Sequence, residues 1–166
     1  MKSAVVALLD AAPVVGCGGD DDGSAGGDTF VADIRPAIEA VDAELGAGQQ
    51  YFEVTASELV TNLIVAVDDA RAAVPYDYLD GELQPPAPKL TGASGFTYSA
   101  DAVDNHQETV LEPVRDELTD STIEAFSIEA GAGGVVRYVV STLSPEGGRL
   151  DVTVAADGTV LEVDPL

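Results

Sequence analysis

The spacing of apolar residues changes along this chain, and the changes constrain its fold more than any other feature. Between Asp28 and Leu45 the apolar side chains recur every three or four residues, which aligns them on one face of a helix. From Tyr51 onward apolar and polar residues alternate, as they do in a half-buried strand. The sequence therefore predicts a helix followed by a run of β-strands.

Proline and glycine positions set the expected bounds of these elements. A helix accepts Pro36 only in its first turn, so we expect the helix to begin near Asp33 and to stop at Gly46. Strands are expected over residues 51–56, 59–67 and 74–79. Asp80 and Gly81 predict a hairpin turn, and the proline-rich stretch 84–89 predicts a stiff connector.

The second half of the chain repeats this order. Thr109 and Glu112 fit a capping box for a helix at 109–118, and Asp157 with Gly158 again predicts a hairpin turn. Strands are expected over residues 123–130, 135–143, 150–156 and 159–163. We therefore predict an α+β fold of two pseudo-repeats, each a helix followed by an antiparallel β-meander, with the helices packed on one sheet face. Two unrelated α+β halves remain the alternative.

The expected repeats occupy residues 29–86 and 105–166, with a connector at 87–104. The stretch RLDVTVAADGTVLEVDP at the end of the second repeat resembles the C-terminal hairpin of PepSY-type domains. The tandem helix-plus-meander order also resembles the architecture of the β-lactamase inhibitor proteins. Both resemblances imply a secreted binding or inhibitory module without catalytic residues.

The first 17 residues, MKSAVVALLDAAPVVGC, have the pattern of a signal peptide. Lys2 precedes an apolar run that is too short to span a bilayer as a helix. Residues 14–17 resemble a bacterial lipobox, which implies an exported prokaryotic lipoprotein anchored to the cell membrane through a lipidated Cys17. Residues 18–28 are rich in Gly and Asp and predict a flexible tether. A cytosolic N-terminus that happens to be apolar is the alternative.

The charge balance limits the classes of partner. The chain has 30 acidic and 7 basic residues, for a formal net charge of -23. This excludes a basic surface for nucleic acid, whose phosphates need Lys and Arg. The expected partners are a cation or a basic protein. The rival interpretation is an acidic structural or salt-adapted surface protein whose carboxylates serve solvation and bind no specific ligand.

The residues that could carry chemistry are few. Cys17 is the single cysteine and His106 the single histidine, so a zinc site lacks further ligands. A Ser94–His106–Asp104 triad is conceivable, but its residues fall on predicted loops and no catalytic motif accompanies them. We therefore expect no enzyme activity and no cofactor. For a hard cation such as calcium, Asp101, Asp104 and Glu108 are the candidate ligands.

Two aromatic residues are the candidates for partner binding. Tyr76 and Tyr78 lie two residues apart, on one face of the predicted strand. Packing of the same side chains in the core or on the sheet surface is the alternative.

Overall fold

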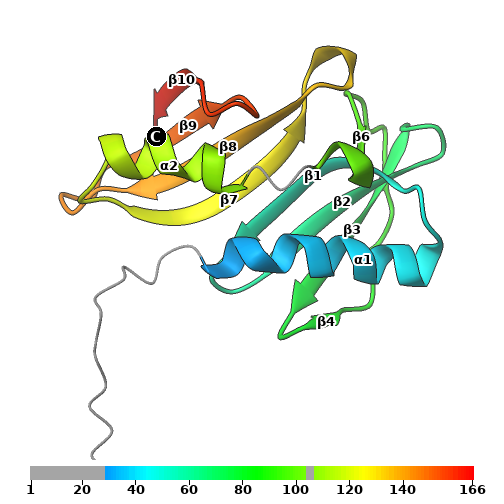
Figure 1. Cartoon of the computed structure of the whole chain (residues 1–166). Helices are drawn as coiled ribbons and strands as arrows, with labels where there is room; N and C mark the ends of the chain where they lie inside the picture. Colours follow the sequence, from blue (N-terminus) through cyan, green and yellow to red (C-terminus); the bar gives the residue numbers. More distant parts are fainter. Residues whose placement is uncertain (1–28, 104–106) are drawn as a thin grey trace, which may run out of the picture.

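The computed structural model describes residues 29–103 and 107–166 (Figure 1). Cys17, the predicted tether, Asp104 and His106 lie outside these ranges, so the predictions made for them are not addressed by the fold. None of the helices in the described ranges combines the length and the apolar character needed to cross a bilayer.

Helices form at the two places where the apolar spacing predicts them. A 3-10 helix η1 leads directly into α1, and a shorter helix α2 begins the second half of the chain. The helical elements are η1 (Thr29–Asp33), α1 (Ile34–Leu45), η2 (Ala100–Ala102), α2 (Gln107–Glu117) and η3 (Ala132–Gly134). Pro36 and Pro113 both lie within the α-helices, and Pro36 occupies the first turn as expected.

The strands also follow the predicted pattern of alternation. The strands of the first half are β1 (Gln50–Ser57), β2 (Thr61–Val67), β3 (Ala72–Leu79), β4 (Glu82–Leu83), β5 (Leu90–Thr91) and β6 (Tyr98–Ser99). The strands of the second half are β7 (Thr122–Ala130), β8 (Val136–Leu143), β9 (Arg149–Val154) and β10 (Val160–Pro165). The connector at 84–89 contains no regular element, as its prolines predict.

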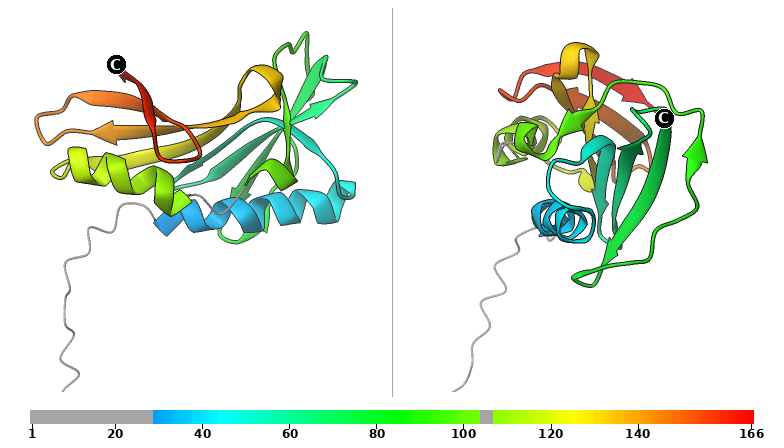
Figure 2. Two further views of the ribbon diagram at one scale, coloured as in Figure 1. Left: turned by 45° about the horizontal axis from the view of Figure 1, so that its top comes forward. Right: turned by 90° about the vertical axis from the view of Figure 1, so that its right-hand side faces the viewer.

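These ten strands form one antiparallel sheet in the order β10-β9-β8-β7-β1-β2-β3-β4, with β5 beside β3 and β6 beside β1. β1 and β7 pair in the middle, with Val54 opposite Ile128. We call this pair the central seam. Both α-helices lie on the same face of the curved sheet, which we call the covered face; the other is the open face (Figures 1 and 2).

The core fills the space between the two helices and the covered face. α1 contributes four buried residues and α2 three: Ile34, Ala37, Ile38, Val41, Val110, Leu111 and Val114. The sheet contributes larger side chains, among them Tyr51, Phe126 and Tyr138, which are fully buried. Each buried Val, Leu, Ile or Phe side chain stabilises the fold by roughly 1.5–3 kcal/mol, so this one core, contiguous across the central seam, holds both halves together.

The prediction of two helix-plus-meander repeats is wrong. The strands form a single ten-stranded sheet instead of two repeated meanders, and the helices are unequal. The first helical segment runs continuously from Thr29 to Leu45, whereas α2 spans only 11 residues. The last strands also differ, because β4 has two residues and β10 has six.

The two Asp-Gly turns that suggested a repeat have different geometry. At the first, Asp80 and Gly81 both have positive φ, and Leu79 pairs directly with Glu82 across a two-residue loop. At the second, Gly158 alone has positive φ, and the loop closes through a hydrogen bond from Ala155 N to Thr159 O. The same dipeptide thus serves two turn types, and its recurrence does not indicate equivalent structure.

Candidate functional site

A hollow of about 640 Å³ opens at the end of the central seam. β1 ends at Ser57, opposite Ala125 of β7, and η1 passes across this end of the sheet. We call it the N-terminal hollow, because Thr29, the first described residue, lies on its edge. It is lined by Thr29, Phe30, Asp33, Ser57, Glu58, Leu59, Thr122, Ile123 and Glu124.

The base of the N-terminal hollow is apolar. Phe30 and Ile123 belong to the core and are buried, and their side chains line the hollow from opposite elements. Leu59 lines it from the β1–β2 turn and is 79% exposed. A single exposed leucine is ordinary on a protein surface, but this one extends the apolar base toward solvent. An apolar group of a ligand would bury Leu59 here.

Three carboxylates line the same hollow. Glu124 is held by Arg149, whose Nε and Nη2 lie 2.9 Å and 3.2 Å from its two carboxylate oxygens. Asp33 and Glu58 have no ion-pair partner among the described residues. The hollow therefore carries a negative charge that is only partly neutralised, and none of its described lining residues is basic. An ammonium or guanidinium group matches it in charge.

Hydroxyl groups of Ser and Thr also line the hollow. Ser57 Oγ donates a hydrogen bond to the carbonyl of Val60, 3.0 Å away, and so fixes the turn that carries Glu58 and Leu59. The described residues include neither His nor Cys, so they cannot assemble a Ser–His or Cys–His pair. The expectation that the chain is not an enzyme stays a prediction.

A second hollow of about 280 Å³ lies against α1, and we call it the α1 hollow. It is lined by Arg35, Ile38, Glu39, Asp42, Ala100, Asp101, Val103 and Gln107. Arg35 donates a long hydrogen bond of 3.5 Å to the carbonyl of Val103, which ties α1 to the segment before α2. Oδ1 of Asp42 and the hydroxyl of Tyr51 are buried, and neither has a hydrogen-bond partner within residues 29–103 and 107–166. Burial, and secondarily the Asp42 carboxylate, raises the pKa of Tyr51 above its ordinary value.

The two candidate calcium ligands within the described ranges, Asp101 and Glu108, lie at different places in the fold. Asp101 lines the α1 hollow, whereas Glu108 lies on α2 and is paired with Arg115 at 2.9 Å. Asp104 lies outside the described ranges. Within those ranges, no three His, Cys, Asp or Glu side chains are close enough to one another to hold a metal ion.

The two candidate binding tyrosines face the helices. Tyr76 is buried in the core, and Tyr78 is partly buried and packs against it. Their predicted role in partner binding stays a prediction. The N-terminal hollow, by contrast, has no sequence motif, because its lining comes from three segments that only the fold brings together. In the sequence, the feature that could have indicated this hollow is Leu59, an apolar residue that follows Ser57 and Glu58 at a turn.

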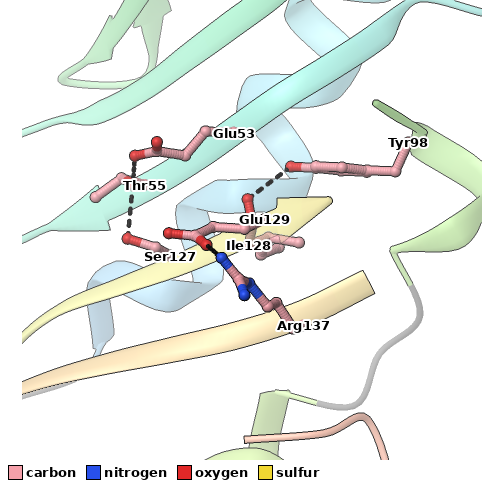
Figure 3. A network of polar contacts seen from close by, with 7 residues as sticks. All are labelled: Glu53, Thr55, Tyr98, Ser127, Ile128, Glu129 and Arg137. Atoms are coloured by element: carbon pink, nitrogen blue, oxygen red, sulfur yellow. Dashed lines mark hydrogen bonds and ion pairs between the residues drawn. The ribbon is translucent and has the colours of Figure 1, made fainter. Parts of the chain in front are cut away.

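The open face carries a polar network across the central seam (Figure 3). Thr55 Oγ1 donates to Glu53 at 2.6 Å and lies 2.7 Å from Ser127 Oγ on the neighbouring strand. Glu53 is directly opposite Glu129, and Arg137 offsets this pair of like charges by contacting Glu129 at 2.7 Å. These contacts link β1 to β7, and Arg137 links β7 to β8.

No protein-family model matches the chain, and no curated protein matches it in sequence. Among solved structures, it is similar to a crystal structure described as that of "a putative lipoprotein" from Clostridium difficile 630. The TM-score is 0.62 and the sequence identity 13%, over 78% of this chain and 90% of that one. This likeness shows a shared fold. The resemblance to β-lactamase inhibitor proteins rested on tandem helix-plus-meander repeats, and the single sheet contradicts that basis. The resemblance to PepSY-type domains stays a prediction.

Proposed function

We propose that this chain is an extracytoplasmic lipoprotein, anchored to the cell membrane by acyl chains on Cys17. In this proposal the folded domain binds a cationic group carried on an apolar body. The observation that carries the binding proposal is the N-terminal hollow, with its buried apolar base and its carboxylates. The anchoring proposal is supported by the lipobox-like residues 14–17 and by the description of the protein that shares the fold.

The chemistry of the hollow favours a ligand with two parts. Asp33 and Glu58 attract a cation, and two opposite charges 4 Å apart interact with roughly 4 kcal/mol at the effective dielectric of a protein surface. Phe30, Ile123 and Leu59 provide contact for an apolar chain, at about 25 cal/mol for each Å² buried. The formal net charge of -23 also draws cations toward the whole molecule. An amine or guanidine on an aliphatic or aromatic body meets both requirements.

The covalent chain limits how far this hollow can be from a membrane. Even fully extended, the residues between Cys17 and Thr29 span at most roughly 40 Å. Two or more acyl chains on Cys17 would be needed for stable anchoring, because a single chain binds membranes only marginally. An anchored domain would thus present the N-terminal hollow close to the membrane surface, where amphipathic cations and basic protein segments concentrate.

Binding at the hollow is tested with octylammonium, which joins an apolar chain to a cation. Octanoate, with the same chain and the opposite charge, is the control ligand. We expect chemical-shift changes at Thr29, Ser57 and Thr122 with octylammonium only. The double substitution D33N/E58Q should weaken binding by about tenfold or more. Equal binding of octanoate, or unchanged binding in D33N/E58Q, would contradict the proposal.

A matched control separates local from global electrostatics in this experiment. Glu112 is an exposed carboxylate on α2 that does not line the hollow. E112Q lowers the net negative charge in the same way as E58Q, and it should leave octylammonium binding unchanged. Equal weakening by E112Q and E58Q would show that the cation responds only to the overall charge.

Anchoring is tested separately, in a prokaryotic host, with the full chain and with C17A. The expected result is a wild-type chain in the detergent phase, with an intact mass that corresponds to an acylated Cys17 as first residue. C17A should move to the aqueous phase. A wild-type chain that begins at Met1 and stays aqueous would disprove anchoring and leave the binding proposal to be judged on its own experiment.

The charge distribution favours one further candidate, a salt-adapted surface protein without a ligand. The ion pairs of Arg71, Lys89 and Arg115 lie at exposed positions, where they contribute little stability. Uncompensated carboxylates therefore dominate the surface. For this candidate, the free energy of unfolding should rise steeply between about 0.1 M and 1 M KCl, as screening shortens to roughly 3 Å. Octylammonium should then bind no more tightly to wild type than to D33N/E58Q.

A further inference from the structure

The two edges of the sheet are built differently. At one edge, β4 has only two residues and is followed by Pro85, Pro86 and Pro88, which cannot donate backbone hydrogen bonds. At the other edge, β10 continues for six residues alongside β9. Within the described ranges no strand pairs with the outer side of β10. This outer side therefore offers a row of backbone donors and acceptors.

Exposed apolar side chains lie along this open edge. All six residues of β10 are exposed, although the strand is paired with β9 along its length. Val160 is 42% exposed, Leu161 59% and Val163 51%. Natural edge strands are commonly short or carry Lys and Pro, which prevent pairing with other chains. β10 has a proline only at its last position and no lysine.

The register of β10 sorts its side chains onto two sides. Val160 and Val163 lie opposite Val154 and Val152, which are buried, so both belong to the covered face. Glu162 and Asp164 lie opposite Thr153 and Asp151 on the open face. A bulge at Leu161 allows Val160 and Val163 to share a face. The edge is thus apolar on one side and acidic on the other.

We propose that β10 is a docking edge that accepts an extended segment of a partner protein, in which basic residues alternate with apolar ones. The segment adds a strand to the sheet, and its backbone hydrogen-bonds to the outer side of β10. Its apolar side chains pack beside Val160 and Val163 on the covered face. Its Lys or Arg side chains lie beside Glu162 and Asp164 on the open face, where opposite charges on adjacent strands attract.

The charge of the edge argues against a second copy of this chain as the occupant. In a symmetric antiparallel pair of β10 strands, the carboxylates of both copies would share the open face. Like charges on directly opposite strands are destabilising, and each copy also carries a formal net charge of -23. A basic segment replaces this repulsion with attraction.

The proposal is tested with a fluorescein-labelled peptide whose central part is Lys-Val-Lys-Val-Lys, titrated with the full chain at low salt. Two control peptides have the same charge: one is N-methylated at alternate residues, and the other has its lysines and valines in separate blocks. We expect both controls to bind about tenfold more weakly or worse, because strand addition needs both backbone donors and alternation. Hydrogen exchange at the outward-facing amides of β10 should slow when the first peptide binds.

Substitutions locate the site. V163K and E162K should each weaken binding of the alternating peptide by about tenfold. L90K is the matched control for V163K, because Leu90 is also an exposed apolar residue but lies on β5. E112K is the matched control for E162K. Circular dichroism checks that each variant folds, and E58Q, which alters the N-terminal hollow, should leave peptide binding unchanged.

Three results would overturn the proposal. If the N-methylated peptide bound as tightly as the unmodified alternating peptide, the attraction would come from charge alone. If no binding were seen at about 1 mM peptide, the outer side of β10 would not accept an added strand. If multi-angle light scattering showed a dimer of the wild type and a monomer of V163K, a second copy of the chain would be the occupant of β10. Each of these results is independent of the outcome for octylammonium.

Discussion

The rings of Tyr51 and Tyr98 pack together in the core, with centroids 6.0 Å apart and planes tilted by 32°. Their hydroxyl groups differ. Tyr98 donates a hydrogen bond to the carbonyl of Ile128 at 3.2 Å, whereas the buried hydroxyl of Tyr51 has no partner among the described residues. A buried polar group without a partner costs stability, and a paired one contributes to it. Neighbouring tyrosines in one core thus have opposite energetic roles.

Removing each hydroxyl should therefore change stability in opposite directions. We expect Y51F to leave the free energy of unfolding unchanged or to raise it by about 1 kcal/mol, and Y98F to lower it by about 1 kcal/mol. Urea denaturation of the two variants and the wild type measures both values. A loss of more than about 1 kcal/mol in Y51F would indicate that a water molecule joins the Tyr51 hydroxyl to Asp42.

Alkaline pH should weaken the wild type more than Y98F. Burial raises the pKa of Tyr98 well above its ordinary value of 10.0 in the folded state. Stability from the neutral hydroxyl is therefore fully present below pH 10 and is lost as pH rises above it, because the unfolded chain ionises first. We expect the stability difference between wild type and Y98F to shrink above about pH 10. A difference that stays constant through this range would contradict burial of Tyr98.

The β2–β3 turn contains strain that glycine would relieve. Asp68, Asp69 and Ala70 follow one another with φ values of 55°, 56° and 61°, a conformation that disfavours side chains with a Cβ. We expect A70G to raise the free energy of unfolding by about 0.5–1 kcal/mol, despite the entropy that glycine adds to the unfolded chain. A43G in α1 is the control, which should lower it by about 1 kcal/mol. A destabilising A70G would indicate that the turn relaxes to negative φ in solution.

Both a positive φ and a close neighbouring atom favour glycine at position 158. Gly48 has the positive φ alone, so comparing the two positions measures the two effects separately. The φ of Gly158 is +86°, and a Cβ at this position would lie 2.9 Å from the carbonyl oxygen of Thr109 on α2. Gly48 has a similar φ of +91° but no atom within 4 Å of its Cβ position. We expect G48A to cost about 1 kcal/mol through backbone strain alone, and G158A to cost at least about 1 kcal/mol more. If thermal unfolding showed the same loss of stability in G48A and G158A, α2 would move away from the added Cβ without cost.

Local sequence features predicted the elements better than their arrangement. Pro36 restricted the helix start, and α1 begins at Ile34, one residue after the expected Asp33. Asp80 and Gly81 predicted a tight hairpin, which the structure contains. Each of these signals acts through a few adjacent residues, so no long-range information was needed.

The arrangement depends on contacts that period-two alternation does not encode. Alternation assigns faces to β1 and β7 but does not say that these two strands pair, and the single sheet follows from that pairing. The N-terminal hollow likewise joins Phe30, Leu59 and Ile123 from distant segments. Alternation predicted a strand at residues 159–163 but not its exposure; β10 is exposed because no element of the described ranges covers that edge.

The central seam also determines when the sheet can be completed during folding. It joins residues such as Thr55 and Ser127, which are 72 positions apart, whereas β1–β2 and β7–β8 are hairpins of adjacent segments. Hairpins form in microseconds, but a contact across a long loop must first overcome the entropy of closing that loop. We therefore expect seam formation to limit the folding rate. Until β7 reaches it, β1 is itself an edge strand, so slow closure leaves the half-formed sheet open to pairing with other chains.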